Sequence, residues 1–240
     1  MNNLSRSSTA GSAGSHHQSS AKRAVFAYLE PSFGMVRSWN FRSTTGFTAV
    51  GLRQREESEP EARTCGVLFA ASGAMSAFDE RERGYQRVKL SSASLTISQG
   101  AHEDSNAQTI LVEALILALA GPSPPNLWMY VPLSSSCHAP NENFPICQTY
   151  VDTVLQGCLC WGGAALAREW VTTTFGWSAY FLNDAPLSRR PWLHRPRHTE
   201  IDEVLVQYSD WTRFSERRHP EEFASHWMSG LRGMWGVPPR

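Results

Sequence analysis

The residues with the clearest potential for chemistry lie between Phe78 and Arg87, in the sequence FDERERGYQR. Within it, Glu82 stands two residues before Gly84 and three before Tyr85, between two apolar, strand-like segments. A carboxylate at the end of a short helix between two strands can lie at the mouth of a small barrel, where it could act as a general base. Glu82 is therefore the candidate catalytic residue, and the alternative is an ordinary solvated acid at a helix end.

Basic and aromatic side chains elsewhere could bind a substrate beside such a base. Arg37 or Arg42 could hold a substrate carboxylate through two parallel hydrogen bonds, although each could equally be a surface arginine. Tyr85 could contact the substrate or simply pack as the first aromatic residue of a strand.

The cysteine and histidine spacings do not form a convincing metal or nucleophile motif. Cys158-Leu159-Cys160 lacks the CxxC spacing of zinc sites, and Pro196 separates His194 from His198. Five cysteines without disulfide-scaffold spacing indicate free, mostly buried thiols in a reducing compartment. We therefore expect neither a metal centre nor a disulfide framework.

The elements that must position Glu82 can be read from hydrophobic periodicity and from the turn residues. A helix is expected from an N-cap at Ser72 to about Arg83, where Gly84 ends it. Strands are expected over 24–28, 64–71, 85–97 and 127–133, with a strand or hairpin over 36–52. The apolar run from Ile110 to Ala120 is expected to be a buried helix or strand.

The second half of the chain is predicted to be helical. Apolar residues recur with helical spacing from Tyr150 to Leu159, Gly162-Gly163 interrupts the pattern, and a second helix follows over 164–175. Another helix is expected around Ile201 to Tyr208. Strands first and helices later predict an α+β fold around one core.

Bulk composition excludes several classes of partner. The 240 residues include 41% hydrophobic and 18% charged residues, which is globular composition, and the formal net charge of zero argues against nucleic acid or an anionic membrane. No apolar run reaches the roughly 18–20 residues that cross a bilayer. Residues 1–23 are rich in Ser and lack acids, which indicates a disordered tail or an organelle transit segment. The expected location is thus cytoplasmic, with an organelle as the alternative.

Three blocks of sequence resemble the gamma-glutamylcyclotransferase-like superfamily, which includes ChaC-type and AIG2-like proteins. The first is the strand Gly66-Val67-Leu68-Phe69 with the segment 78–87, and the second is the strand Val36-Arg37-Ser38-Trp39-Asn40. The third comprises 148–159, 172–177 and Asn183-Asp184, and is similar to the C-terminal extension of a plant, algal and protist branch.

The resemblance implies a small mixed β-barrel over 24–135 with flanking helices, preceded by the tail 1–23 and followed by a helical extension over 136–240 packed on it. It also implies intramolecular cyclisation of a γ-glutamyl amino acid or glutathione to 5-oxoproline, with release of the amine and without a metal or cofactor. The implied partner is a small γ-glutamyl substrate, and the oligomeric state stays open. The catalytic glutamate falls on Glu82, and the binding residues fall on Tyr28, Leu29, Arg37, Tyr85 and Tyr130.

The chain departs from the family pattern in one loop. Tyr28 matches the tyrosine of the family's "YGSL"-type loop, whose backbone N–H groups stabilise the oxyanion, but Leu29-Glu30 stand where Gly-Ser is usual. Two alternatives therefore accompany the cyclotransferase. One is a catalytically degenerate barrel that binds a small ligand or a protein, and the other is a related transfer enzyme acting on another γ-glutamyl conjugate.

Overall fold

The computed structural model describes residues 24–71, 73–98, 106–184 and 197–209, so the tail 1–23, the N-cap at Ser72 and the residues beyond 209 lie outside the described part. The fold is mixed α+β, as the order of the sequence patterns predicted. The strands are β1 (Ala24–Leu29), β2 (Met35–Arg42), β3 (Thr48–Gln54), β4 (Thr64–Phe69), β5 (Tyr85–Leu90), β6 (Leu95–Ser98), β7 (Leu127–Pro132), β8 (Ile146–Cys147), β9 (Thr174–Phe175) and β10 (Phe181–Leu182). The helices are α1 (Met75–Arg81), α2 (Asn106–Ala120), α3 (Gln148–Thr172) and α4 (His198–Tyr208).

The strands form three small sheets. β1 lies between β4 and β6 and is antiparallel to both, and β5 pairs antiparallel with β7. The largest sheet has the order β10-β8-β3-β2-β9, in which the hairpin β2–β3 receives parallel partners from the C-terminal half of the chain. The predicted helical extension over 136–240 therefore also contributes strands to this sheet.

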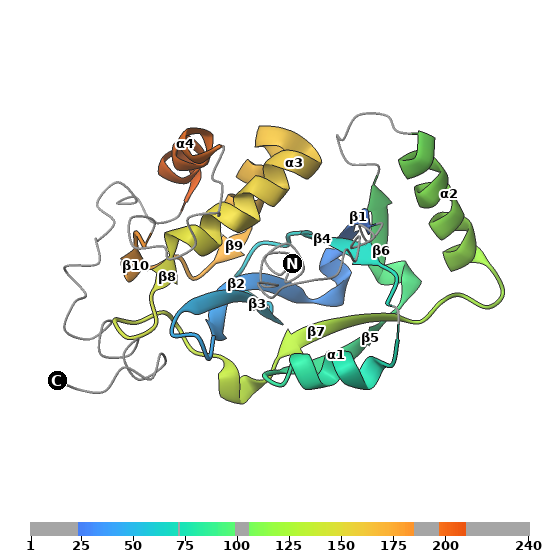
Figure 1. Ribbon diagram of the computed structural model, residues 1–240, viewed down its shortest axis with the longest axis horizontal. Helices are drawn as coiled ribbons and strands as arrows, with labels where there is room; N and C mark the ends of the chain where they lie inside the picture. The colour runs from blue at the N-terminus through green and yellow to red at the C-terminus, as the bar shows by residue number, and fades with distance from the viewer. Residues whose placement is uncertain (1–23, 72, 99–105, 185–196, 210–240) are drawn as a thin grey trace, which may run out of the picture.

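Figure 1 shows α3 and α4 over one face of the β2–β3 hairpin, with α1, β5 and β7 on the other side and α2 beside β1 and β6. The main core lies beneath α3. Its fully buried side chains include those of Trp39, Trp170, Phe181 and Leu155. These residues come from both the first and the second half of the sequence, so α3 and α4 pack on one continuous core.

Three sequence expectations need correction. The segment 85–97 forms two strands because a 3₁₀ turn at Ser92–Ser94, capped by the Ser91 hydroxyl, separates β5 from β6. Helix α1 begins at Met75 with Ala74 as its N-cap. The apolar run in α2 is helical but is not buried as a whole, since Val112 is 2% exposed and Leu117 is 72% exposed.

The break at Gly162-Gly163 is confirmed, because α3 kinks where Gly163 takes φ +63° and ψ −161°. All five cysteines are free, as predicted, and three of them are buried. Within the described residues, no helix combines the length and the apolar character that crossing a membrane requires.

Candidate active site

The candidate base Glu82 occupies the tight turn that joins α1 to β5. It is the C-cap of α1, with its own N–H donating to the carbonyl of Phe78 at 2.9 Å. Its carbonyl accepts from the N–H of Tyr85 at 2.9 Å, so backbone bonds hold the residue on both sides. Gly84 allows the turn to pack closely on β2, because an added Cβ at this position would lie 2.9 Å from the ring of Phe41.

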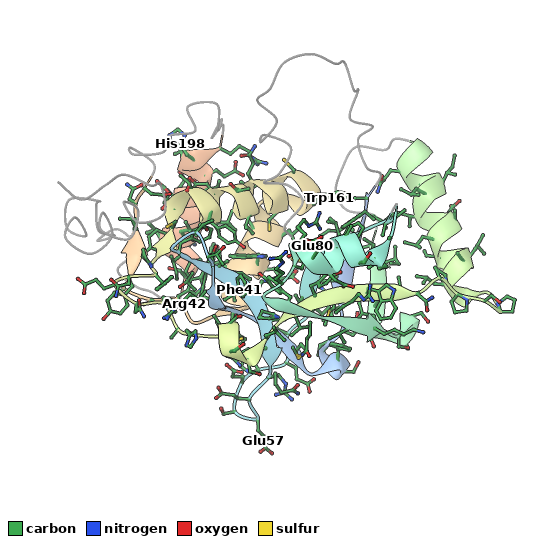
Figure 2. The ribbon with its side chains drawn as sticks, turned by 60° about the horizontal axis from the view of Figure 1, so that its bottom comes forward. Phe41, Arg42, Glu57, Glu80, Trp161 and His198 are labelled. Atoms are coloured by element: carbon green, nitrogen blue, oxygen red, sulfur yellow. The ribbon has the colours of Figure 1, made fainter. Side chains whose placement is uncertain are left out.

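The Glu82 side chain is buried, with 6% of the residue exposed. Its Oε1 accepts a hydrogen bond of 2.9 Å from Nε of Arg81, whose side chain is about one-third exposed. The neighbouring acid Glu80 differs, because it pairs with Arg83 on the surface at 3.0 Å and both side chains are largely exposed. Figure 2 labels Glu80 on α1, the helix that leads into this turn, and Phe41 on β2, whose ring lies close to Gly84.

Two of the predicted binding residues lie on the strands next to Glu82. Tyr85 opens β5, and its ring packs on that of Phe41 with the centroids 4.2 Å apart. Tyr130 lies on β7, and its hydroxyl donates to Oδ1 of Asp79 at 2.8 Å. Burial, followed by this hydrogen bond to Asp79, raises the pKa of Tyr130, and the Glu82 carboxylate acts in the same direction. Tyr130 therefore stays protonated at neutral pH and remains a hydrogen-bond donor.

The other predicted binding residues have different surroundings. The Tyr28 hydroxyl points toward α3, where it donates to Oε2 of Glu169 at 3.4 Å, and the guanidinium of Arg63 lies 4.0 Å from its ring centroid. Arg37 is 1% exposed, and its donors point to β4, β9 and the end of α3. The interactions of Tyr28 and Arg37 thus lie at the α3 side of the sheets, and those of Glu82 and Tyr130 lie at α1.

The loop after β1 occupies the place of the loop that supplies backbone donors for an oxyanion in the family pattern, and the sequence departs from that pattern at Leu29-Glu30. The N–H of Glu30 donates to Ser94 at 2.9 Å, and the N–H groups of Phe33 and Gly34 donate to Glu30 and Pro31 within a 3₁₀ turn. Pro31 has no N–H. These donors of the loop are therefore already used inside the protein.

Leu29 itself is buried in the strand preceding this loop. It pairs with Thr64 of β4 on one side and with Leu95 of β6 on the other, and 7% of it is exposed. Its buried aliphatic side chain contributes to the packing of β1. Whether Leu29 also binds a substrate stays a prediction from the sequence.

Sequence reasoning overlooked the thiols that lie beside Arg37. Cys65 of β4 is 3.4 Å from Nη1 of Arg37, and Cys158 of α3 belongs to the same cluster of buried residues as Cys65. The sequence signal was the presence of one cysteine in an apolar strand and another on the apolar face of a helix. The residues are 93 positions apart (158 − 65), and no local pattern brings them together.

Comparison with family models, with curated proteins and with solved structures finds no significant match for this chain. The resemblance to the gamma-glutamylcyclotransferase-like superfamily therefore rests on the sequence blocks described above. The site must be judged on its own geometry, which provides a buried carboxylate at a helix end, a nearby arginine and a protonated tyrosine.

Proposed function

We propose that this protein is a gamma-glutamylcyclotransferase of the ChaC/AIG2-like type, with β1 to β7 as its mixed barrel and Glu82 as its general acid/base. Its substrate is a γ-glutamyl amino acid or glutathione, and its products are 5-oxoproline and the released amine. We assign it to the cytoplasm, in keeping with its free thiols, and the Ser-rich N-terminus leaves an organelle as the alternative.

The observation that carries the proposal is the placement of Glu82. It is the carboxylate that the family resemblance marks as catalytic, and it is buried while Glu80, two residues earlier, is largely exposed. Burying a carboxylate is unfavourable unless it is paired, and the partner here is Arg81 at 2.9 Å. A buried carboxylate with a single charged partner, held in a fixed turn, is an arrangement that is common at proton-transfer sites. Stability alone does not require such a residue at this position.

The reaction requires little more than proton transfer and positioning. The substrate's own α-amine attacks its γ-carbonyl carbon, the ring C–N bond forms, and the bond to the leaving amine breaks. Glu82 takes the proton from the attacking ammonium and returns it to the leaving nitrogen, a role worth about 10²–10⁴-fold in rate. Because nucleophile and electrophile belong to one molecule, holding the substrate folded removes much of the entropic barrier.

The test is 5-oxoproline release from γ-glutamyl-alanine and from glutathione by the wild-type chain and by Glu82→Gln. The substitution keeps the shape of the side chain and removes the base, so we expect turnover to fall by about 10²–10⁴-fold. Glu80→Gln is the matched control, because it removes an exposed carboxylate from the same helix, and its activity should equal that of the wild type. Equal activity of Glu82→Gln and wild type would refute the assignment.

A second candidate is favoured by the loop after β1. Since the N–H groups of Glu30, Phe33 and Gly34 already donate within the protein, they cannot also stabilise an oxyanion without rearranging. The alternative is a barrel that binds a γ-glutamyl ligand without converting it. Calorimetric binding of γ-glutamyl-alanine by a folded wild-type chain that releases no 5-oxoproline would select this candidate over the enzyme.

A further inference from the structure

The sheet of β5 and β7 carries basic and aromatic side chains on one of its two faces. Residues directly opposite each other in an antiparallel pair lie on the same face, and the faces alternate along each strand. The other face includes Leu90 and Val131, which are buried. Solvent reaches the first face, because Lys89 is exposed and Trp128 is 38% exposed. The pairs on this first face are Tyr85–Pro132, Arg87–Tyr130 and Lys89–Trp128.

Two cations on this face share one indole ring. The guanidinium carbon of Arg87 lies 4.8 Å from the ring centroid of Trp128, and Nζ of Lys89 lies 6.0 Å from it. Nη1 of Arg87 is also 3.4 Å from Oδ2 of Asp79. Among the residues that the structure describes, no carboxylate lies within ion-pair distance of Lys89. Two positive charges therefore face one negative charge, and a further anion between them would reduce their mutual repulsion.

These cations continue the candidate active site along the sheet. The Tyr130 hydroxyl donates to Oδ1 of Asp79 at 2.8 Å, and the other oxygen of this carboxylate is the one near Arg87. Asp79 lies three residues before Glu82, on the helix α1 that Figure 1 shows beside β5 and β7. Burial and the bond to Asp79 raise the pKa of Tyr130 most, and the Glu82 carboxylate is close enough to add to that shift. The candidate base, the phenol and Arg87 thus surround one region, and Lys89 lies one residue pair beyond it.

The strand spacing indicates how long a leaving group must be to reach these cations. Successive residues on one face of a strand are about 7 Å apart, so along β5 Arg87 lies about 7 Å and Lys89 about 13 Å beyond Tyr85. An extended peptide advances by at most about 3.3–3.6 Å per residue. A leaving dipeptide therefore carries its carboxylate about 7 Å from the scissile nitrogen, twice as far as a leaving amino acid does.

We propose that Arg87 and Lys89, beside the indole of Trp128, bind the terminal carboxylate of a two-residue leaving group. The protein would then favour γ-glutamyl peptides over γ-glutamyl amino acids. This inference rests on the proposed reaction at Glu82, because it requires the scissile bond to lie there, beside Tyr85. Glutathione belongs to the favoured class, but the subsite recognises the length and the carboxylate of the leaving group and makes no use of a thiol.

The first experiment compares 5-oxoproline release from γ-glutamyl-alanyl-glycine and from the same peptide with a C-terminal amide. These two substrates differ in the negative charge at the end of the leaving group. The wild type should have the higher kcat/KM for the acid, and Lys89→Met should lower this acid-to-amide ratio by about 2–5-fold, as expected for an exposed ion pair. Lys89→Glu should lower the ratio further, because it places a negative charge against the carboxylate.

Arg83→Met is the matched control. It removes an exposed cation that pairs with Glu80 on α1, away from the Trp128 ring, so the acid-to-amide ratio should equal that of the wild type. Raising the ionic strength to about 1 M should reduce the ratio in the wild type and in Arg83→Met, since salt screens exposed charges. An unchanged ratio in folded Lys89→Met and Lys89→Glu would overturn the subsite.

The length of the leaving group is tested with γ-glutamyl-alanine. The wild type should have a kcat/KM about 2–5-fold higher for γ-glutamyl-alanyl-glycine than for γ-glutamyl-alanine, and Lys89→Met should narrow this difference. A wild type that prefers γ-glutamyl-alanine would contradict the predicted reach of the subsite.

Calorimetry separates a failure of the subsite from a failure of the proposed reaction. If the wild type releases 5-oxoproline from the acid and the amide with equal kcat/KM, the reaction stands and the subsite is refuted. If it releases none from either peptide, the reaction is refuted, and the dissociation constants of the two peptides test the subsite. Tighter binding of the acid, weakened by about 2–5-fold in Lys89→Met, would support a carboxylate-binding subsite, and equal binding of acid and amide would refute it.

Discussion

Tyr28 lies at the interface between β1 and α3, and the charged groups there change its pKa. Its phenol lies between the Glu169 carboxylate and the Arg63 guanidinium. Burial and then Glu169 raise its pKa from 10.0 to about 12, although Arg63 acts in the opposite direction. The environment therefore favours the protonated phenol over the phenolate.

This shift predicts a loss of stability at alkaline pH. Between pH 10.0 and about 12, Tyr28 is ionised in the unfolded chain but keeps its proton in the folded chain. Its contribution to the free energy of unfolding is therefore complete below the unfolded pKa of 10.0, and it is lost as the pH rises through the folded pKa of about 12. Urea unfolding midpoints across this window should fall more steeply for the wild type than for Tyr28→Phe. Parallel pH dependences would show that the phenol does not experience this environment.

At the residue scale, the sequence predicted the location of Glu82 but not the environment of Arg37. Glu82 is positioned by its neighbours, because Gly84 ends α1 and Tyr85 starts β5, and such signals are local. Arg37 receives its acceptors from Thr173 and Thr174, more than 130 positions away, so spacing along the chain could not show that it is buried. Its predicted role in holding a substrate carboxylate is untested.

At the element scale, α3 consists of two helical rods joined at a glycine pair. Gly163 has φ +63° and ψ −161°, a combination that residues with a Cβ rarely adopt, and an added Cβ there would meet no atom within 4 Å. At Gly162, by contrast, an added Cβ would lie 2.6 Å from Cβ of Leu166. The kink thus depends on backbone freedom at one glycine and on close packing at the other.

Gly163→Ala should therefore destabilise the protein by about 1–3 kcal/mol through backbone strain alone. Gly66→Ala is the control, since Gly66 lies in β4, has no positive φ and has no atom within 4 Å of an added Cβ. Its effect should stay below about 1 kcal/mol. Chemical denaturation should be used to measure the unfolding free energy of both variants. If both substitutions lower it by a similarly small amount, the kink tolerates a Cβ at residue 163.

Helices and strands were easiest to predict where the hydrophobic periodicity ended at a glycine or a proline. β1, β4, β7 and the broken helix α3 follow from apolar patterns bounded by glycine or proline. The division between β5 and β6 was missed because Val88, Leu90, Leu95 and Ile97 continue an apolar pattern across the turn. The exposure of α2 was missed because its sequence is apolar on every side, so periodicity does not distinguish a buried face from an exposed one.

At the scale of the whole molecule, the core joins residues that sequence analysis assigned to separate parts. Phe26 and Trp39 precede residue 135, whereas Leu155, Trp170 and Phe181 follow it, and all belong to one cluster of buried side chains. Such sharing makes the two parts depend on each other for stability.

Phe181→Ala should lower the unfolding free energy by about 3–5 kcal/mol, because the ring is completely buried. The loss should affect the whole molecule, so tryptophan fluorescence and far-ultraviolet circular dichroism should still report one coincident, earlier transition. Two separated transitions would show that the first and second parts of the chain unfold independently.

The parallel pairing of β9 with β2 also constrains how this protein can be made. Arg37 and Ser38 are among the first described residues to be synthesised, yet their strand partners are Thr174 and Phe175. The ribosome must therefore extrude most of the chain before the central sheet acquires this edge, and contacts this distant in sequence form slowly. Until then, Arg37 lacks its threonine acceptors and the β2–β3 hairpin lacks its C-terminal neighbours. Exposed strand edges make such a nascent chain prone to aggregation, so we expect it to benefit from chaperones during this interval.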